Sequence, residues 1–176
     1  MTNELYFDTD CISAFLWINN TNILHELYGG KMVLPEPVYQ ELSNPCIPHL
    51  KQQADQLVNA KDVSIKTIDL GTEEYKIYND LINGADGRII IGKGEASGIA
   101  LAKTYNGILA SNNYKDIKTY IDEYNLRHID TGHILKEALD KGIITELDGN
   151  NIWSQMLSKR RMLPARSFTE YLGSIK

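Results

Sequence analysis

Short runs of strand-forming residues alternate with longer helical segments along this chain of 176 residues. Apolar and β-branched runs predict strands at 5–7, 32–34, 63–68, 107–110 and 127–129. Apolar residues at helical spacing predict helices at 10–18, 21–28, 35–43, 48–61, 72–82, 94–105, 114–124, 131–140, 150–160 and 167–173. Strands that alternate with helices form parallel sheets covered on both faces. The sequence therefore predicts a three-layer α/β/α fold with a central, mostly parallel sheet.

Length and composition indicate one ordinary globular domain over 1–176, in which 146–176 form a C-terminal helical extension. The apolar runs are too short to span a membrane, and the start of the chain lacks a signal-peptide pattern, so we expect a cytoplasmic protein without membrane contact. Cys11 and Cys46 each lie in or beside an apolar segment, which favours buried free thiols.

Acidic side chains follow the predicted strands at points where a parallel sheet gathers its ligands. Asp8 and Asp10 come directly after the first strand, at the edge where open α/β sheets bind ligands. Glu41 lies on the helix after the second strand, and Glu95 opens the helix near 94–105. Hard oxygen ligands on separate elements suit Mg²⁺ or Mn²⁺. The sequence therefore predicts a divalent metal site.

Each acidic residue also has a simpler interpretation. Asp8 could cap the following helix, although Thr9 or Asp10 could fill that role and leave Asp8 free. Glu41 alone is typical of a solvated helix face, and Glu95 of a first-turn acid that complements the helix dipole. Asp10 has two equally good interpretations: it could cap the helix, or it could hold the metal ligands in place.

The chain resembles the PIN-domain family of metal-dependent ribonucleases over about residues 5–145. The resemblance is carried by the Asp-Thr-x-x-Ile start at Asp8, by Val38-x-x-Glu41-Leu42, by the Gly94-Glu95-Ala96-Ser97 segment, and by the strand that leads into Ser111-Asn112-Asn113. Ile129-Asp130-Thr131-Gly132-His133 and Lys141-Gly142-Ile143-Ile144 are also similar to one subgroup, the predicted nucleic-acid-binding PIN proteins. Those proteins are relatives of the toxin ribonucleases of bacterial toxin–antitoxin modules.

The resemblance implies Asp8, Glu41 and Glu95 as catalytic and metal-binding acids. The family's fourth acid falls on Asn113, or less readily on Asn112, where this sequence departs from the pattern. Asp116, one helical turn along, is the residue that could compensate as a metal ligand, while the two asparagines alone are also typical of a turn and a helix cap. The implied function is a Mg²⁺- or Mn²⁺-dependent endoribonuclease that cuts single-stranded RNA, as a toxin component. The alternative is a degenerate PIN domain that binds RNA or a protein without cleavage.

The implied partners are RNA and a cognate antitoxin protein, with a homodimer as a further expectation. The net charge of −5 does not favour nucleic-acid binding, so local cations would have to flank the acidic site. Lys93, Lys115 and Lys118 are the predicted contacts to RNA, because they adjoin the site segments. The 159–161 run of Lys-Arg-Arg is either a solvated helix face or a more distant phosphate contact.

Two other motifs point elsewhere and are weaker. The 87–93 segment matches most of a phosphate-binding loop, but Gly94 replaces the Ser or Thr that would contact Mg²⁺, and its interior is bulky. Asp8-x-Asp10 after a strand is also similar to haloacid-dehalogenase-type phosphatases, the second choice of enzyme. That family expects a Thr where this chain has Ile12.

Overall fold

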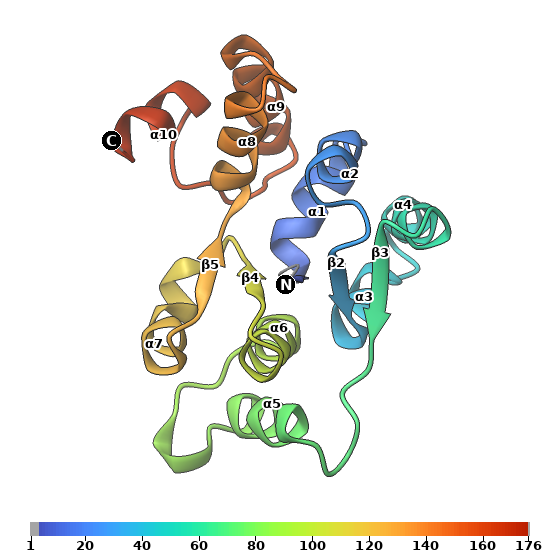
Figure 1. The fold of residues 1–176 in the computed structure, drawn as a ribbon, viewed down its shortest axis with the longest axis vertical. Coiled ribbons are helices and arrows are strands. Elements are labelled where there is room, and N and C mark those ends of the chain that lie inside the picture. Colours follow the sequence, from blue (N-terminus) through green and yellow to red (C-terminus); the bar gives the residue numbers. More distant parts are fainter. Residues whose placement is uncertain (1–3, 176) are drawn as a thin grey trace.

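The computed structural model describes residues 4–175 and has a five-stranded, wholly parallel sheet at its centre (Figure 1). The strand order is β3-β2-β1-β4-β5. The strands are β1 (Leu5–Phe7), β2 (Met32–Pro35), β3 (Val63–Lys66), β4 (Ile108–Ala110) and β5 (Arg127–Ile129). The chain builds one half of the sheet outward from β1 and then crosses to build the other half. The strand order reverses between β1 and β4, and such a reversal is where α/β sheets open a binding crevice.

The part of the chain from 4 to 175 contains ten α-helices and one short 3-10 helix, and α8, α9 and α10 follow the last strand. The α-helices are α1 (Thr9–Trp17), α2 (Asn22–Tyr28), α3 (Glu36–Leu42), α4 (Pro48–Asn59), α5 (Glu73–Asn83), α6 (Lys93–Thr104), α7 (Tyr114–Tyr124), α8 (Thr131–Asp140), α9 (Glu146–Ser158) and α10 (Phe168–Ser174). The 3-10 helix is η1 (Ala85–Gly87). The expected elements are all found, with their ends shifted by a few residues.

The sheet separates two hydrophobic cores, which confirms the predicted three layers. Along β1, Leu5 and Phe7 enter the core under α1, α2, α8 and α9, whereas Tyr6 between them enters the core under α5, α6 and α7 (Figure 1). Side chains alternate across a strand, so these short strands serve both layers. In β4, Ala110 enters the same core as Leu5 and Phe7, and Leu109 enters the same core as Tyr6.

The C-terminal helices pack onto the same core as the first strand. Helix α9 begins at Glu146, earlier than the predicted 150, because Thr145 and Asp148 form a capping box. Helix α10 lies against α8 and α9, and its Tyr171 ring occupies the space that a side chain at Gly132 would take. Glycine at that position therefore lets α10 dock closely on α8.

One cysteine expectation is wrong. Cys11 is a buried free thiol, as predicted, but Cys46 is exposed. The Cys46 amide donates to the side-chain oxygen of Asn44 in the turn between α3 and α4. That turn faces solvent, so the neighbouring apolar residue does not carry Cys46 inward. No helix within residues 4–175 is long and apolar enough to cross a membrane.

Candidate active site

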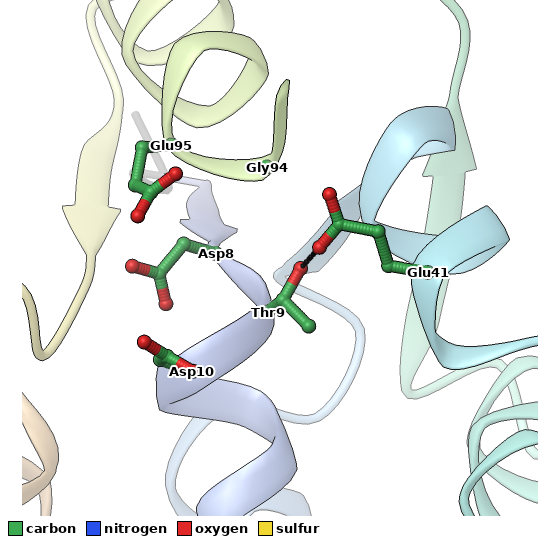
Figure 2. Close-up of a pocket in the computed structure, with 6 residues that line it drawn as sticks. All are labelled: Asp8, Thr9, Asp10, Glu41, Gly94 and Glu95. Atoms are coloured by element: carbon green, nitrogen blue, oxygen red, sulfur yellow. Dashed lines mark hydrogen bonds between the residues drawn. The ribbon is translucent and has the colours of Figure 1, made fainter. Parts of the chain in front are cut away.

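An acidic cavity of about 120 Å³ opens at the carboxyl end of β1, where the strand order reverses. Its lining comes from the start of α1, from α3 and from the first turn of α6: Asp8, Thr9, Asp10, Glu41, Gly94 and Glu95. Figure 2 shows the carboxylates of Asp8, Asp10 and Glu95 on one side and Glu41 beyond Thr9 on the other. Within residues 4–175, no lysine or arginine lines the cavity. The structure thus brings together the acids that the sequence predicted.

Asp8 is the most constrained of these acids. Its side chain is 1% exposed, and Oδ1 accepts a hydrogen bond of 2.7 Å from the Cys11 amide, which caps α1. Of the three residues that could cap this helix, the structure therefore uses Asp8 and not Thr9 or Asp10. One carboxylate has two oxygens, however, and Asp8 Oδ2 is buried with no hydrogen-bond partner among residues 4–175. Asp8 both caps the helix and presents a free oxygen.

Burial raises the pKa of the Asp8 carboxyl to about 7, because the ionised form loses its water. The Ser111 side chain and the Cys11 amide oppose that rise, whereas the charges of Asp10 and Glu95 add to it. A buried carboxylate oxygen without a donor is costly unless a proton or a cation reaches it. The Asp8 environment therefore favours a positively charged ligand.

Glu41 is held away from the other acids by a short hydrogen bond from the Thr9 hydroxyl (Figure 2). The first turn of α6 approaches this pair closely. A Cβ at Gly94 would lie 2.8 Å from Thr9 Oγ1 and 3.3 Å from Glu41 Oε2. Glycine at 94 is therefore needed for α6 to bring Glu95 to the cavity.

Asn113 joins two carboxylates instead of supplying a third. Its Nδ2 donates to Glu95 Oε1 at 3.2 Å and to Asp116 Oδ2 at 2.8 Å. Asp116 does not line the cavity and is connected to it only through this amide. Asn112 faces the other way, and its Oδ1 accepts the Thr131 amide at 2.9 Å. Between the two asparagines, Asn113 is thus the one beside the site.

The donor set suits a hard divalent cation, although the side chains do not surround one point. Among residues 4–175, no three His, Cys, Asp or Glu side chains converge closely enough to enclose a metal ion. Mg²⁺ keeps several waters and needs only one or two carboxylates directly. Asp8, with its free oxygen, and Glu95 would be the direct ligands, and Asp10 and Glu41 would hold the waters around the ion. The residues present fit such a group.

The three predicted RNA-binding lysines differ in their surroundings. Lys93 and Lys115 are exposed in the first turns of α6 and α7, next to Glu95 and Asn113 in the chain. Lys118 is also exposed, but its ammonium forms a 2.9 Å ion pair with Asp122 on the same helix. Lys115 is therefore more available to a phosphate than Lys118.

The two competing motifs do not form the sites they resemble. Within the 87–93 segment, residues 88–92 are irregular, and Ile89 and Ile90 are 70% and 65% exposed, so it is no loop of backbone amides cradling a phosphate. Asp10 lies inside the first turn of α1, and its exposed side chain borders the cavity. The basic 159–161 residues end α9, where Arg161 stacks over Trp17 with 5.5 Å between the guanidinium carbon and the ring centroid.

Sequence reasoning missed a second group of polar side chains beside the acidic cavity. His128, Asp130 and His133 lie at the end of β5 and the start of α8, and Tyr171 of α10 reaches them. The histidines show no metal-ligand spacing to one another along the chain. The tertiary fold brings them together with Tyr171, so chain spacing carried no signal. The run Asp130-Thr131-Gly132-His133 directly after a strand was the only available indication.

A protein-family model described as a PIN domain matches residues 5–176. The chain therefore belongs to the PIN-domain family. The resemblance stated from the sequence is confirmed, and the match extends through the C-terminal helices.

One solved VapBC structure shares the fold, and two further VapBC structures also match the chain. A DNA-bound VapBC from Salmonella typhimurium matches with a TM-score of 0.53 and 13% identity, over 73% of this chain and 98% of that chain. VapBC-1 from nontypeable Haemophilus influenzae has a TM-score of 0.49 and 20% identity, over 72% and 97%. VapBC2 from Rickettsia felis, bound to a promoter DNA fragment, has a TM-score of 0.49 and 16% identity, also over 72% and 97%. No curated protein matches the chain.

Proposed function

We propose that this PIN domain is a Mg²⁺- or Mn²⁺-dependent endoribonuclease that hydrolyses phosphodiester bonds in single-stranded RNA. The observation that carries the proposal is the unpartnered, buried oxygen of Asp8 in a cavity that residues 4–175 line with three further carboxylates and with no lysine or arginine. A carboxylate that serves only in a structural ion pair has a cationic side chain beside it. Membership in the PIN-domain family supports the same activity.

The chain's own residues divide the work of the reaction. Asp8 and Glu95 would hold the metal, which when bound supplies positive charge to the phosphate and lowers the pKa of water. Glu41, fixed by Thr9, and Asp10 would orient the water molecules that complete the site. Asn113 fixes the Glu95 carboxylate through its amide and adds no negative charge that would repel the phosphate. Lys93 and Lys115 would attract the RNA backbone beside the cavity.

The test is RNA cleavage with and without Mg²⁺ or Mn²⁺, with Asp8→Asn as the inactivating variant. Asparagine keeps an oxygen that can accept the Cys11 amide, so the cap of α1 is retained while the charge is lost. Asp62→Asn is the matched control, since Asp62 is also a buried carboxylate and lies outside the cavity. Asp8→Asn should abolish metal-dependent cleavage and Asp62→Asn should retain it. Equal cleavage by wild type and Asp8→Asn would remove Asp8 from the mechanism.

The second candidate is a degenerate PIN domain that binds RNA or a protein without cutting. Asn113 favours it, because an uncharged amide stands where the family expects an acid. This candidate predicts that wild type binds single-stranded RNA without hydrolysing it, and that Asn113→Asp restores cleavage. Turnover by wild type that Asn113→Asp does not improve would eliminate it.

We also propose a toxin role with a cognate antitoxin as protein partner. The support is the resemblance to toxin ribonucleases together with the fold shared with the Salmonella VapBC protein. Co-expression with a small DNA-binding protein encoded beside this chain should yield a stable complex that no longer cleaves RNA. A neighbouring product that neither binds nor inhibits would contradict this role.

A further inference from the structure

A second cavity has a volume of about 380 Å³. It is formed where the start of α7, the end of β5, the start of α8 and the end of α10 meet. Its lining combines aromatic, imidazole and carboxylate groups: Tyr114, His128, Asp130, His133, Tyr171 and Ile175. We call it the β5–α10 pocket. None of these residues lines the acidic cavity.

The loop between β4 and α7 forms hydrogen bonds to a residue of each cavity. The Ser111 carbonyl is bonded to His128 Nε2 at 2.8 Å on the pocket side. Asn113 bonds to Glu95 on the acidic side, and the next residue, Tyr114, lines the pocket. A strand whose phosphate lay at the acids would therefore have a neighbouring nucleotide at the β5–α10 pocket.

One side of the pocket is an aromatic surface. The Tyr114 side chain is 48% exposed, and its ring lies 5.6 Å from that of His128 at 33°. Exposing half of a tyrosine ring forgoes favourable burial of apolar area. Tyrosine and histidine rings are the side chains on which proteins stack unpaired bases.

The His128 ring also has a defined hydrogen-bonding state. Burial lowers its pKa, so the ring is neutral near pH 7. Because Nε2 faces a carbonyl oxygen, the proton belongs on Nε2, and Nδ1 is left as an acceptor. That Nδ1 makes no hydrogen bond within residues 4–175. It is available to an N–H group of a ligand.

The remaining polar side chains of the pocket, Asp130, His133 and Tyr171, are joined by hydrogen bonds. His133 Nδ1 lies 2.9 Å from Asp130 Oδ1 and 3.0 Å from the Tyr171 hydroxyl, which also donates to Asp130. These contacts fix Asp130 and leave His133 Nε2 and Asp130 Oδ2 without partners in residues 4–175. Pairing with Asp130 raises the pKa of His133, and in the protonated ring Nε2 is a donor beside the acceptor Asp130 Oδ2. This pair, in the same pocket as an aromatic surface, matches the edge and face of a nucleobase.

We propose that the β5–α10 pocket binds one unpaired nucleobase of the RNA strand whose backbone occupies the acidic cavity, with Tyr114 and His128 stacking on the base and Asp130 and His133 contacting its edge. The proposal rests on the proposed function for its choice of ligand. Its consequence is that cleavage depends on the identity of the base next to the scissile phosphate.

Neutral ribonucleosides test the pocket without the metal or the chemistry, because they carry no phosphate. Adenosine, guanosine, cytidine and uridine are titrated into the whole protein while the imidazole proton resonances of its four histidines are followed by NMR. We expect at least one nucleoside to shift His128 and His133 saturably, and ribose alone to shift neither. His25 and His49, which lie outside the pocket, are internal controls. No shift with any nucleoside at its solubility limit, or equal shifts at all four histidines, would overturn the proposal.

Tyr114→Leu removes the aromatic surface and should weaken nucleoside binding roughly 5- to 150-fold, the range of one base–aromatic stack. Tyr105→Leu is the matched control, since Tyr105 is 46% exposed and does not line the pocket. With short single-stranded RNAs that differ at one base, Tyr114→Leu should also reduce the preference of cleavage for that base. Nucleoside binding without any RNA cleavage would leave the pocket standing and refute the nuclease. Cleavage whose base preference Tyr114→Leu leaves unchanged would refute the pocket alone.

Discussion

Replacing Asn113 by aspartate turns its bridge between two carboxylates into a cluster of three negative charges. In wild type the amide of Asn113 donates to Glu95 Oε1 at 3.2 Å and to Asp116 Oδ2 at 2.8 Å. Asn113→Asp removes both donors and places a new charge where they stood. Without a cation, we expect the variant to be less stable than wild type, and divalent metal to return the lost stability.

The expected loss of stability in Asn113→Asp has two contributions. A hydrogen bond to a charged group contributes about 1.5–3 kcal/mol when buried, and less here because Asp116 is exposed. Like charges about 3 Å apart repel by roughly 5 kcal/mol at an effective dielectric of about 20, before the side chains turn away or take up a proton. With that relaxation we expect a net loss of about 2–4 kcal/mol. For a chain of this length, that loss lowers Tm by roughly 4–16 °C.

The assay is thermal unfolding of wild type, Asn113→Asp and Asn113→Ala in EDTA and in saturating Mg²⁺ or Mn²⁺. Asn113→Ala loses the same donors without adding charge, so the difference between the two variants isolates the repulsion. Mg²⁺ should raise the Tm of Asn113→Asp more than that of wild type, because the extra carboxylate is an extra ligand.

Two results would refute this reasoning. If Asn113→Asp in EDTA is as stable as Asn113→Ala, the three carboxylates are not crowded together in solution. If Mg²⁺ stabilises neither wild type nor Asn113→Asp, the acidic cavity does not hold this cation.

Three further predictions concern the surroundings of the site. His133→Gln should lower the free energy of unfolding by a few tenths of a kcal/mol at pH 5.5 and by less at pH 8.5. Pairing with Asp130 raises the pKa of His133, so the stabilisation by the ion pair is complete below the ordinary histidine pKa of about 6.5 and is lost as pH rises through the folded value. Urea unfolding at both pH values measures the effect, and an equal loss at both would contradict it. Lys115→Gln should reduce the slope of log affinity for RNA against log salt concentration by about 0.7. Lys118→Gln should reduce it by less, because Lys118 is paired with Asp122 on the same helix. Equal slopes for the two variants in fluorescence anisotropy titrations would contradict this difference. Gly94→Ala should lower Tm and metal-dependent cleavage together, because the added methyl meets polar atoms at 2.8 and 3.3 Å, and a fully active variant would show that the first turn of α6 can move outward freely.

The fold was largely predictable because the alternation of side chains along strands and the helical spacing of apolar residues both coincide with burial. Leu5 and Phe7 lie on one face of β1 and Tyr6 on the other, as a strand covered by helices on both sides requires. The helix ends were less predictable where a cap used an unexpected pair. Thr145 and Asp148 start α9 before its apolar positions begin, so hydrophobic spacing placed its start too late.

The site was predictable to the level of which residues meet, but not how each one is used. Parallel strands all end at one edge, so Asp8, Glu41 and Glu95 could be brought together from their order along the chain. The division of Asp8 into a capping oxygen and a free oxygen depends on the exact direction of its side chain. The bridge made by Asn113 likewise depends on the distance between two helices, which no sequence pattern specifies.

The pairing of β1 with β4 has a consequence for the order in which this protein folds. The cap from Asp8 to Cys11 is local, whereas the Asp8 amide also donates to the Ala110 carbonyl at 2.9 Å, across roughly one hundred residues of intervening chain. Local helical turns form within microseconds, and non-local strand pairing is much slower. During refolding Asp8 therefore stays hydrated and ionised until β4 arrives, and only then does burial raise its pKa to about 7. Refolding near pH 7 should thus take up protons in a phase that follows helix formation, which a pH indicator dye in stopped-flow refolding would record.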